Sequence, residues 1–256
     1  MHVPAGKERG DLELVKTLAI VQARMGSSRL PGKVLMDLAG ETVLQRVVRR
    51  LGRAALVNQV VVATSLSPMD DAVVSECNRL GVDHFRGSEA DVLDRYYSCA
   101  QAFAASSVVR ITADCPVIDP ALVDLTIRSF GEKFCDYASN ALVPGYPRGL
   151  DVEVFTLAAL TRAWSEARKP YEREHVTPYL YEHPKLFRSV SVNAKRDYGD
   201  LRWTLDTVED LECLRAIYER LGGRNDFCWE DVLQIVQREP QLASMNSHVL
   251  QKAVHG

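Results

Sequence analysis

Three short apolar segments, separated by stretches with helical spacing, constrain the fold of this 256-residue chain more than any other feature. The segments lie at residues 17–22 (TLAIVQ), 59–64 (QVVVAT) and 107–112 (SVVRIT). Their length and their content of β-branched residues are typical of buried strands. Because strands that alternate with helices form a mainly parallel sheet covered by helices on both faces, we predict an α/β fold with a mainly parallel, mixed sheet.

Helical spacing is clearest between the first two strands. Apolar residues at positions 43, 44, 47, 48 and 51 predict a helix over 43–51. Arg46, Arg49, Arg50 and Arg53 occupy much of the rest of its surface. Since an amphipathic helix turns its polar residues toward solvent, the pattern places these four arginines outside the core.

Capping residues mark where further helices begin, because their side chains satisfy the free N–H groups of a first turn. Pro68 and Pro120 stand at first helical positions, where proline is favoured. The predicted starts are Ser67 with Asp70, Ser88 with Asp91, Asp119 with Pro120, and Thr207 with Asp210.

The second half of the chain is less regular. We predict strands over 82–85, 151–155, 187–192 and 201–205. We predict helices over 157–168, 171–181, 208–221 and 229–238, the second of them interrupted near Pro178. No linker divides the chain. We therefore predict a single domain over 17–240 with an inserted subregion at 135–200, a flexible N-terminal tail at 1–16 and a C-terminal tail at 241–256.

The charge balance limits the partners of the chain. Lys and Arg number 31 against 34 Asp and Glu, a formal net charge of −3, which argues against a basic coat for nucleic acid.

No apolar run approaches the roughly 20 residues that cross a bilayer, and no signal-peptide pattern is seen, so we expect no membrane association and a cytoplasmic location. The six cysteines are scattered without a C-x-x-C pair, so a zinc site is not expected.

The near-neutral total conceals two segments of opposite charge. Residues 22–53 carry seven Arg and Lys against two acidic residues, whereas residues 197–212 carry six acidic residues against one Arg. The predicted fold brings a few members of each to one edge of the sheet, where an anionic ligand and a cation can lie between them.

The loop at 22–33 (QARMGSSRLPGK) follows the first strand, at the carboxyl end where α/β sheets bind ligands. Glycine lets the backbone approach a phosphate, and arginine and lysine match its charge and geometry. The loop lacks the Walker A and G-x-G-x-x-G patterns. A solvated loop with locally paired charges is the alternative, but the position after a buried strand favours a phosphate site.

Two aspartates follow predicted strands. Asp114 comes after the strand at 107–112, and Asp206 ends the strand predicted at 201–205. Two carboxylates at one sheet edge suit Mg²⁺, which prefers one or two protein carboxylates, with water and phosphate oxygens completing its shell. Each has a structural alternative, because Asp206 precedes a helix and Asp114 precedes a Cys-Pro turn.

Six motifs in a fixed order resemble those of the CTP-dependent sugar-acid cytidylyltransferases, in particular the subgroup named for a spore-coat polysaccharide biosynthesis protein. The resemblance covers about residues 17–235, and the motifs are specific only in combination. They are R-x-G-S-x-R-L-P-G-K at 24–33, RGSEADVLDRYY at 86–97, RITADCPVIDP at 110–120, YPRGLDVEVF at 146–155, REHVTPYLYEHP at 173–184 and WTLDTVEDL at 203–211.

The resemblance implies a Rossmann-like nucleotide-diphospho-sugar transferase fold whose inserted subregion builds the acceptor pocket and a homodimer interface. It implies CTP as the nucleotide and Mg²⁺ held by Asp114 and Asp206. The implied catalytic residues are Arg24, Lys33 and Asp114, and the implied acceptor-binding residues are Asn140, Arg148 and Glu153. The implied nucleotide-binding residues are Gln22, Ala23, Arg24, Gly26, Ser27, Ser28, Arg29, Lys33, Arg86 and Ser88.

Other residues near these motifs have structural interpretations. Ser88 is also an N-cap, and Cys115 stands where the keto-deoxyoctulosonate branch of the family has a glutamate. We assign helix capping to Asp91, a surface ion pair to Asp94 and Arg95, packing or hydrogen bonding to His175, and core positions to Trp164 and Trp203.

We expect transfer of CMP from CTP to a sugar-acid hydroxyl, with release of pyrophosphate, for polysaccharide or glycan biosynthesis; the sequence identifies no general base. One alternative is a nucleotidyltransferase for a phosphorylated sugar, polyol or phosphonate, since Arg148 suits a phosphate as well as a carboxylate. Another is a nucleotide-sugar-dependent glycosyltransferase, although Asp114 begins D-C-P rather than the usual D-x-D. A regulatory nucleotide-binding module without turnover is the third.

Overall fold

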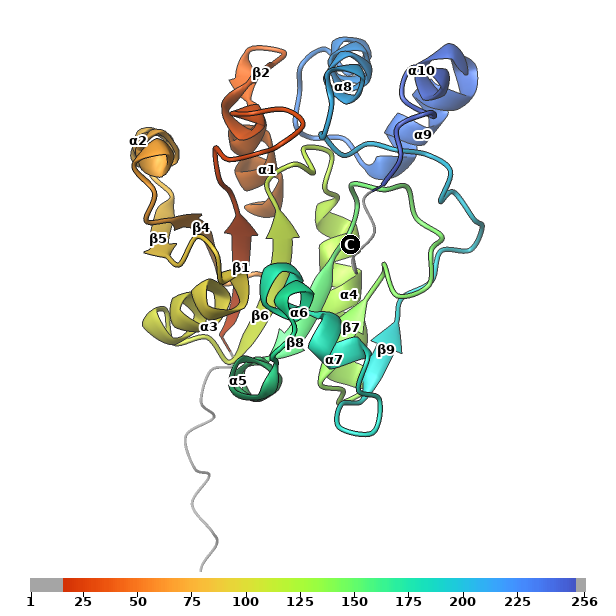
Figure 1. The fold of residues 1–256 in the computed structure, drawn as a ribbon. Helices are drawn as coiled ribbons and strands as arrows, with labels where there is room; N and C mark the ends of the chain where they lie inside the picture. Colours follow the sequence, from red (N-terminus) through yellow and green to blue (C-terminus); the bar gives the residue numbers. More distant parts are fainter. Residues whose placement is uncertain (1–15, 252–256) are drawn as a thin grey trace, which may run out of the picture.

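A seven-stranded sheet forms the centre of the computed structural model, which describes residues 16–251 (Figure 1). Its strands are β1 Thr17–Gln22, β4 Gln59–Ser65, β5 Asp83–Gly87, β6 Ser107–Thr112, β7 Tyr137–Ser139, β8 Glu153–Thr156 and β9 Ser189–Ser191. They lie in the order β5-β4-β1-β6-β8-β7-β9. The first four are mutually parallel and β8 runs antiparallel to its neighbours, so the predicted mixed, mainly parallel sheet is confirmed.

The central strand β1 is buried on both faces because its side chains alternate across the sheet. Leu18 and Ile20 pack on one face and Ala19 and Val21 on the other, and none of the four is exposed. Gln22 at the end of β1 pairs in register with Thr112 at the end of β6. The loops that follow β1 and β6 therefore leave the sheet side by side at one edge.

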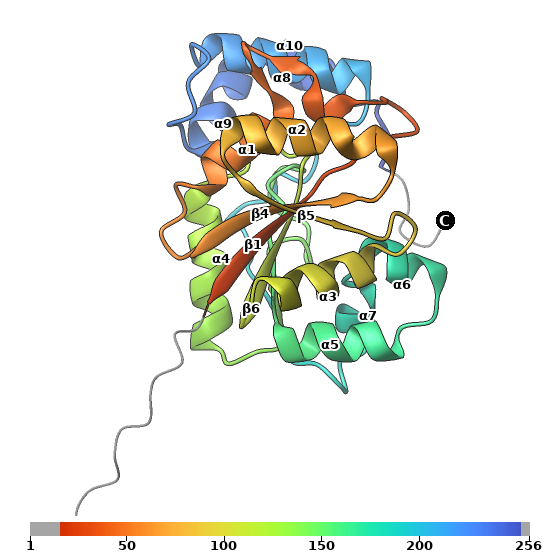
Figure 2. The same cartoon turned by 90° about the vertical axis from the view of Figure 1, so that its left-hand side faces the viewer.

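Helices cover both faces of the sheet, as predicted (Figure 2). One face packs against α3 Val92–Ala102, α5 Leu157–Glu166, α6 Pro170–His175 and α7 Pro178–Tyr181. The other packs against α1 Val43–Leu51, α2 Asp71–Leu80 and α4 Pro120–Glu132. A break at Thr177 separates α6 from α7, close to the interruption that Pro178 predicts.

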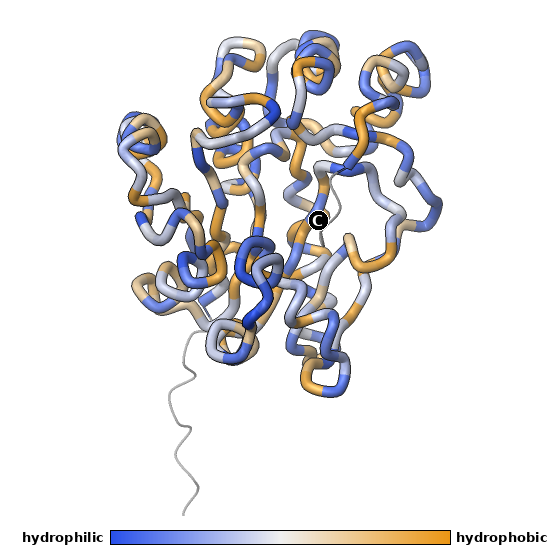
Figure 3. Tube along the Cα trace, viewed as in Figure 1, coloured by the Kyte–Doolittle hydropathy of each residue, from blue (hydrophilic) through white to orange (hydrophobic). Residues whose placement is uncertain are grey.

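A third apolar layer lies beyond the carboxyl edge of the sheet. It contains α8 Val208–Arg220, α9 Trp229–Arg238, α10 Gln241–Ser244 and the small hairpin β2 Asp37–Leu38 with β3 Glu41–Thr42. Trp203 and Tyr218 are buried within it. Figure 3 shows apolar colour along the inner strands and hydrophilic colour on outer turns of several peripheral helices. No helix in residues 16–251 is long and apolar enough to span a membrane.

Several predicted helix starts are confirmed. Asp119 caps α4 by accepting hydrogen bonds from the backbone N–H groups of Ala121 and Leu122. Thr207 and Asp210 form the predicted capping box at the start of α8. The helices predicted at 43–51 and 229–238 have the bounds of α1 and α9.

The strand predicted over 201–205 is wrong. Only Arg202 forms an isolated bridge, to Arg148, and the segment otherwise runs beside loops. The Trp203 N–H donates to the Arg148 carbonyl at 2.7 Å, and the Leu205 N–H donates to the Asp114 carbonyl at 2.8 Å. The alternating apolar residues of this segment fill the third apolar layer instead of a place in the sheet.

The prediction that the arginines of α1 face solvent is wrong for two of the four. Arg46 and Arg50 are 1% and 0% exposed. Arg50 donates to the backbone carbonyls of residues 117, 118, 225 and 227, and its guanidinium lies over the Phe227 ring at 3.6 Å. A buried guanidinium with five N–H donors satisfies loop carbonyls that have no strand or helix partner. Arg49 and Arg53 are partly or fully exposed, as the pattern predicts.

Three predictions from local pattern are also wrong. Asp70 does not complete a capping box with Ser67; it lies in a short 3-10 turn and accepts from Ser65 and from the Met25 N–H. The helix after Ser88 begins only at Val92, so the start predicted at Ser88 is wrong, whereas the capping role predicted for Asp91 is confirmed. Arg95 does not pair with Asp94 on the surface, because it is fully buried and donates to the Ser88 carbonyl.

The segment assigned to a C-terminal tail begins with α10, which the sequence pattern did not reveal. Leu242 and Asn246 are 3% and 1% exposed. The Asn246 amide donates to the Arg202 carbonyl at 3.0 Å and to Asp210 at 2.9 Å. Residues 241–251 therefore pack against the domain.

Replacing Arg50 with methionine should destabilise the protein. The substitution leaves several buried carbonyls without donors, so we expect the free energy of unfolding to fall by about 2–4 kcal/mol. Urea unfolding followed by circular dichroism measures the change.

Arg49→Met on the same helix is the matched control, because the Arg49 side chain is 57% exposed. Its free energy of unfolding should stay within about 0.5 kcal/mol of the wild type. Equal losses in the two variants would contradict the role given to Arg50.

Candidate active site

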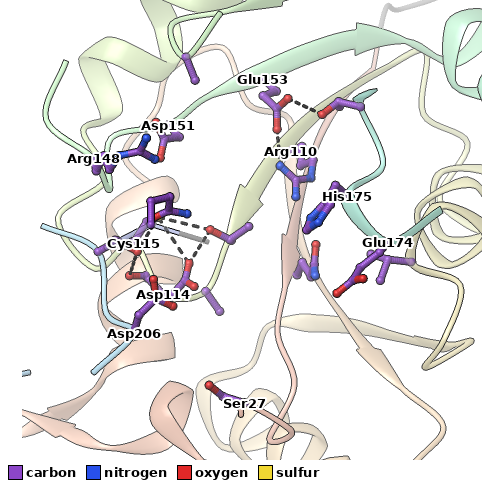
Figure 4. A pocket seen from close by; sticks show the side chains of 18 of the residues that line it. Ser27, Arg110, Asp114, Cys115, Arg148, Asp151, Glu153, Glu174, His175 and Asp206 are labelled. Carbon is purple, nitrogen blue, oxygen red and sulfur yellow. Dashed lines mark hydrogen bonds and ion pairs between the residues drawn. The ribbon is translucent and has the colours of Figure 1, made fainter. Parts of the chain in front are cut away.

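A cavity of about 660 Å³ opens at the carboxyl ends of β1 and β6. Its wall includes residues of the loop after β1, the loop after β6, the segment before β8, helix α6 and the segment before α8 (Figure 4). Eleven of the fifteen predicted site residues line it, namely Gln22, Arg24, Gly26, Ser27, Ser28, Arg29, Lys33, Asp114, Arg148, Glu153 and Asp206. The fold thus brings most of the predicted site together.

Lys33 joins the two predicted metal aspartates. Its Nζ lies 2.8 Å from Asp114 Oδ2 and 2.8 Å from Asp206 Oδ1, and it also donates to the Leu205 carbonyl at 2.7 Å. All three ammonium donors are therefore used. Lys33 is itself only 9% exposed, so a positive charge is held between two carboxylates at the cavity wall.

Further cations surround Asp206. Its Oδ2 accepts from Arg29 at 2.8 Å and from Arg202 at 2.7 Å. Burial alone would raise the pKa of Asp206, but Lys33, Arg202 and Arg29 outweigh it and lower the pKa below its usual range. Burial likewise disfavours the charged ammonium, yet Asp114 and Asp206 raise the pKa of Lys33. Both groups therefore stay ionised at neutral pH.

The predicted metal pair can supply only two carboxylates. The described residues contain no group of three or more His, Cys, Asp or Glu that could hold a metal ion together. Asp114 and Asp206 nevertheless converge within 2.8 Å of one ammonium. Two such carboxylates fit a Mg²⁺ ion that takes its other ligands from water and phosphate.

Unpaired guanidinium groups point to the anions that the cavity can take. Within residues 16–251, Arg24 and Arg148 line the cavity without a hydrogen bond or ion pair from their side chains. Gln22 Oε1 is also buried without a partner there. Arg24 is half-buried, and a partly enclosed cation without a counterion is costly, so Arg24 favours an anionic ligand. Arg148 is exposed, and its guanidinium can bind a carboxylate or phosphate in the same cavity.

The loop after β1 is fixed by its own backbone and by Asp70. The Met25 N–H donates to Asp70 at 2.7 Å, and the Met25 carbonyl accepts from the Ser27 and Gly32 N–H groups, each at 2.9 Å. Gly32 has a φ of 72°, a left-handed conformation that glycine adopts without strain and that turns the chain into Lys33. The sequence therefore positions Lys33 through a glycine turn.

Four predicted site residues do not line the cavity. Ala23 is buried, and Ser88 Oγ accepts from the Asp91 N–H at 3.0 Å. Arg86 donates to the Ser65 and Ser67 carbonyls and to Asp71. Asn140 is 2% exposed, and its amide bonds the Leu150 carbonyl at 2.8 Å and the Val152 N–H at 2.7 Å. The side chains of Arg86, Ser88 and Asn140 thus have structural partners.

A buried polar network lies at the other end of the cavity, across from Asp114 (Figure 4). Arg110 of β6 forms an ion pair with Glu153 of β8, directly across the strand pair. Glu153 also accepts from Tyr137 and Thr177, each at 2.6 Å. An arginine inside an otherwise apolar strand, SVVRIT, was the signal in the sequence for this network.

His175 lies in the cavity wall beside this network. Its side chain makes no hydrogen bond to another described residue, so of the two structural roles predicted for His175 packing is the one that stays a prediction. Burial lowers the pKa of His175, and the Arg110 and Arg24 charges add to that effect. The imidazole is therefore neutral at pH 7.

The C-terminal segment also reaches the cavity, which the sequence did not indicate. Gln251 lines it and accepts from Arg202 at 3.0 Å. The Leu250 carbonyl accepts from Arg29 at 3.2 Å. Residues 250 and 251 therefore contact two of the arginines that surround Asp206.

The sequence that builds this site matches a known protein family. The family model described as "Cytidylyltransferase" matches residues 18–232. The chain belongs to the cytidylyltransferase family.

Relatives in this family extend over most of the chain. The spore coat polysaccharide biosynthesis protein SpsF of Bacillus subtilis is 35% identical over 233 residues, which are 89% of this chain and 96% of that protein. The 3-deoxy-manno-octulosonate cytidylyltransferase of Mesorhizobium japonicum is 33% identical over 228 residues, 79% of this chain and 86% of that protein. A cytidylyltransferase structure from Leptospira borgpetersenii matches with a TM-score of 0.86 and 33% identity, covering 90% of this chain and 97% of that one.

Proposed function

We propose that this cytidylyltransferase transfers CMP from CTP to a hydroxyl group of a sugar acid and releases pyrophosphate. The observation that carries the proposal is the Lys33 ammonium held between Asp114 and Asp206, next to a loop with two further arginines. This arrangement supplies fixed positive charge for a triphosphate and two carboxylates for a divalent cation.

The loop residues bind and neutralise the nucleotide. Arg24 has no protein partner in the described chain, so it is available to a phosphate, and Arg29 and Lys33 line the same cavity. Asp114 and Asp206 would hold Mg²⁺, which when bound supplies Lewis-acid stabilisation of the phosphate charge. The acceptor oxygen attacks the α-phosphorus, the bond to the β-phosphate breaks, and pyrophosphate leaves.

The charges at the acceptor end favour a monoanionic acceptor. Arg148 is the arginine there without a partner in residues 16–251, because Arg110 is neutralised by Glu153. Asp151 lines the wall beside Arg148. One free guanidinium among carboxylates suits one carboxylate, whereas a phosphate dianion would meet more repulsion. This supports a sugar acid over a phosphorylated acceptor.

Pyrophosphate release tests the reaction class. The protein is incubated with Mg²⁺, each of the four nucleoside triphosphates and a set of 2-keto sugar acids. We expect release only with CTP and a keto acid, and loss of activity on chelation of the metal. Equal rates with all four nucleotides, or a requirement for a sugar phosphate, would contradict the proposed reaction.

Arg148→Ala tests the acceptor assignment. Losing a charge-assisted contact of about 1.5–3 kcal/mol should raise the acceptor KM by about 10–100-fold. The KM for CTP should stay nearly constant, because Arg24, Arg29 and Lys33 are intact. Steady-state kinetics with either substrate varied separates the two effects.

Arg188→Ala is the control for this experiment, since Arg188 is exposed in the same subregion and does not line the cavity. An unchanged acceptor KM in Arg148→Ala, or the same rise in both variants, would remove Arg148 from the acceptor site.

We also propose a homodimer formed through the inserted subregion. Strand β9 stands at the end of the sheet order, so one of its edges has no strand partner among the described residues. One chain has a mass of 28.6 kDa, and light scattering should give twice this mass. A monomer at micromolar concentration would exclude the dimer.

A further inference from the structure

Five carboxylates line the cavity, and they differ in what neutralises them. Asp114, Asp206 and Glu153 each form an ion pair with Lys or Arg. Asp151 and Glu174 have no ion pair within the described chain. The only hydrogen bond of the Asp151 carboxylate there is a long one, 3.4 Å, from the Gly149 N–H. Asp151 is therefore a cavity carboxylate whose oxygens remain available to a ligand.

The backbone on both sides of Asp151 is tightly fixed. Gly149 has a φ of 101°, and a Cβ there would lie 2.6 Å from the Trp203 backbone, so only glycine fits this close approach. Arg148 exchanges backbone hydrogen bonds of 2.9 and 2.7 Å with residues 201 and 203. On the other side, Asn140 accepts from the Val152 N–H at 2.7 Å. These contacts give Asp151 a defined position, as a reacting group requires.

Asp151 lies on the side of the cavity that holds the predicted metal pair. Figure 4 shows it beside Arg148, on the same side of the cavity as Asp114, Cys115 and Asp206, whereas Glu174 and His175 lie on the far side. Asp151 is not part of the metal pair, because the described residues form no group of three or more possible metal ligands. It thus lies on the side of the cavity that holds the predicted metal pair, without being needed to hold a cation.

The surroundings suit a group that takes up a proton. Asp151 is exposed to the open cavity, but the protein atoms around its carboxylate disfavour the charged form and raise its pKa, and the Glu153 and Asp114 charges add to this. The Gly149 N–H and Arg148 act in the opposite direction. Cys115 faces the same region, but burial raises the pKa of its thiol well above the usual range, so it stays protonated. A carboxylate whose pKa is raised toward neutrality is a better base than an ordinary one.

We propose that Asp151 is the general base of the reaction. This inference rests on the proposed function. The Asp151 carboxylate removes the proton of the acceptor hydroxyl as that oxygen bonds to the α-phosphorus of CTP. The electron pair of the broken P–O bond leaves with pyrophosphate, and protonated Asp151 then gives its proton to water. Arg148 orients the acceptor carboxylate next to it, and Asn140 and Gly149 act as positioning residues.

Asp151→Asn tests this role with little change in shape. We expect kcat to fall by about 10²–10⁴-fold, the usual contribution of a general base. The Kd for CTP, measured by calorimetry, and the thermal unfolding midpoint should match the wild type. In the wild type, kcat/KM should decline at low pH as Asp151 becomes protonated, and this acid limb should disappear in Asp151→Asn.

Glu174→Gln is the matched control, because Glu174 is the other cavity carboxylate without an ion pair in the described chain. Its kcat should stay within about fivefold of the wild type and its pH profile should keep the acid limb. A second variant, Asp151→Ala, should regain part of its rate when formate is added, since formate can replace the missing carboxylate.

Two results would overturn the inference: a kcat in Asp151→Asn within threefold of the wild type, or a lower kcat with the acid limb unchanged. An equal loss in Glu174→Gln would also overturn it. Failure of the proposed function is distinguishable, because the wild type itself would then release no pyrophosphate with CTP and any sugar acid.

Discussion

The Lys33 ammonium between Asp114 and Asp206 is the interaction on which the site depends. It joins the loop after β1 to the loop after β6 and to the segment before α8, three pieces of chain up to 173 residues apart in sequence. Without a cation between them, two carboxylates at this separation would repel each other in a poorly hydrated wall. The ion pairs of Lys33 therefore hold the loop after β1 against Asp114 and Asp206.

The rest of the structure serves to place these groups. Gly32 turns the chain into Lys33, Asp70 fixes the backbone of the same loop, and Arg202 holds Asp206 from behind. Beyond the sheet edge, the buried Arg50 bonds the loops that follow β6 and α8. Arginines therefore have two roles in this fold. The buried Arg50 donates hydrogen bonds to backbone carbonyls, whereas Arg24 and Arg148 line the cavity and can bind an anionic ligand.

Patterns set by repetition or by motif could be predicted from the sequence. The parallel sheet follows from TLAIVQ, QVVVAT and SVVRIT, and the part of the cavity wall at residues 22–33 follows from the loop motif. Features set by long-range contact could not. By local spacing, Arg46 and Arg50 look like exposed residues of an amphipathic helix, and the segment at 201–205 looks like a strand. Both predictions fail because the groups that these residues contact lie elsewhere in the chain. Local spacing carries no information on such partners.

The Lys33 ammonium lies between Asp114 and Asp206, where we expect a metal ion to bind when the nucleotide is present. A crystal structure with a non-hydrolysable CTP analogue and Mn²⁺ tests it most directly. We expect a metal ion bound by both Asp114 and Asp206, with Lys33 Nζ moved within hydrogen-bond distance of a phosphate oxygen. A structure in which Lys33 still bridges the two aspartates while metal and triphosphate bind elsewhere would contradict it.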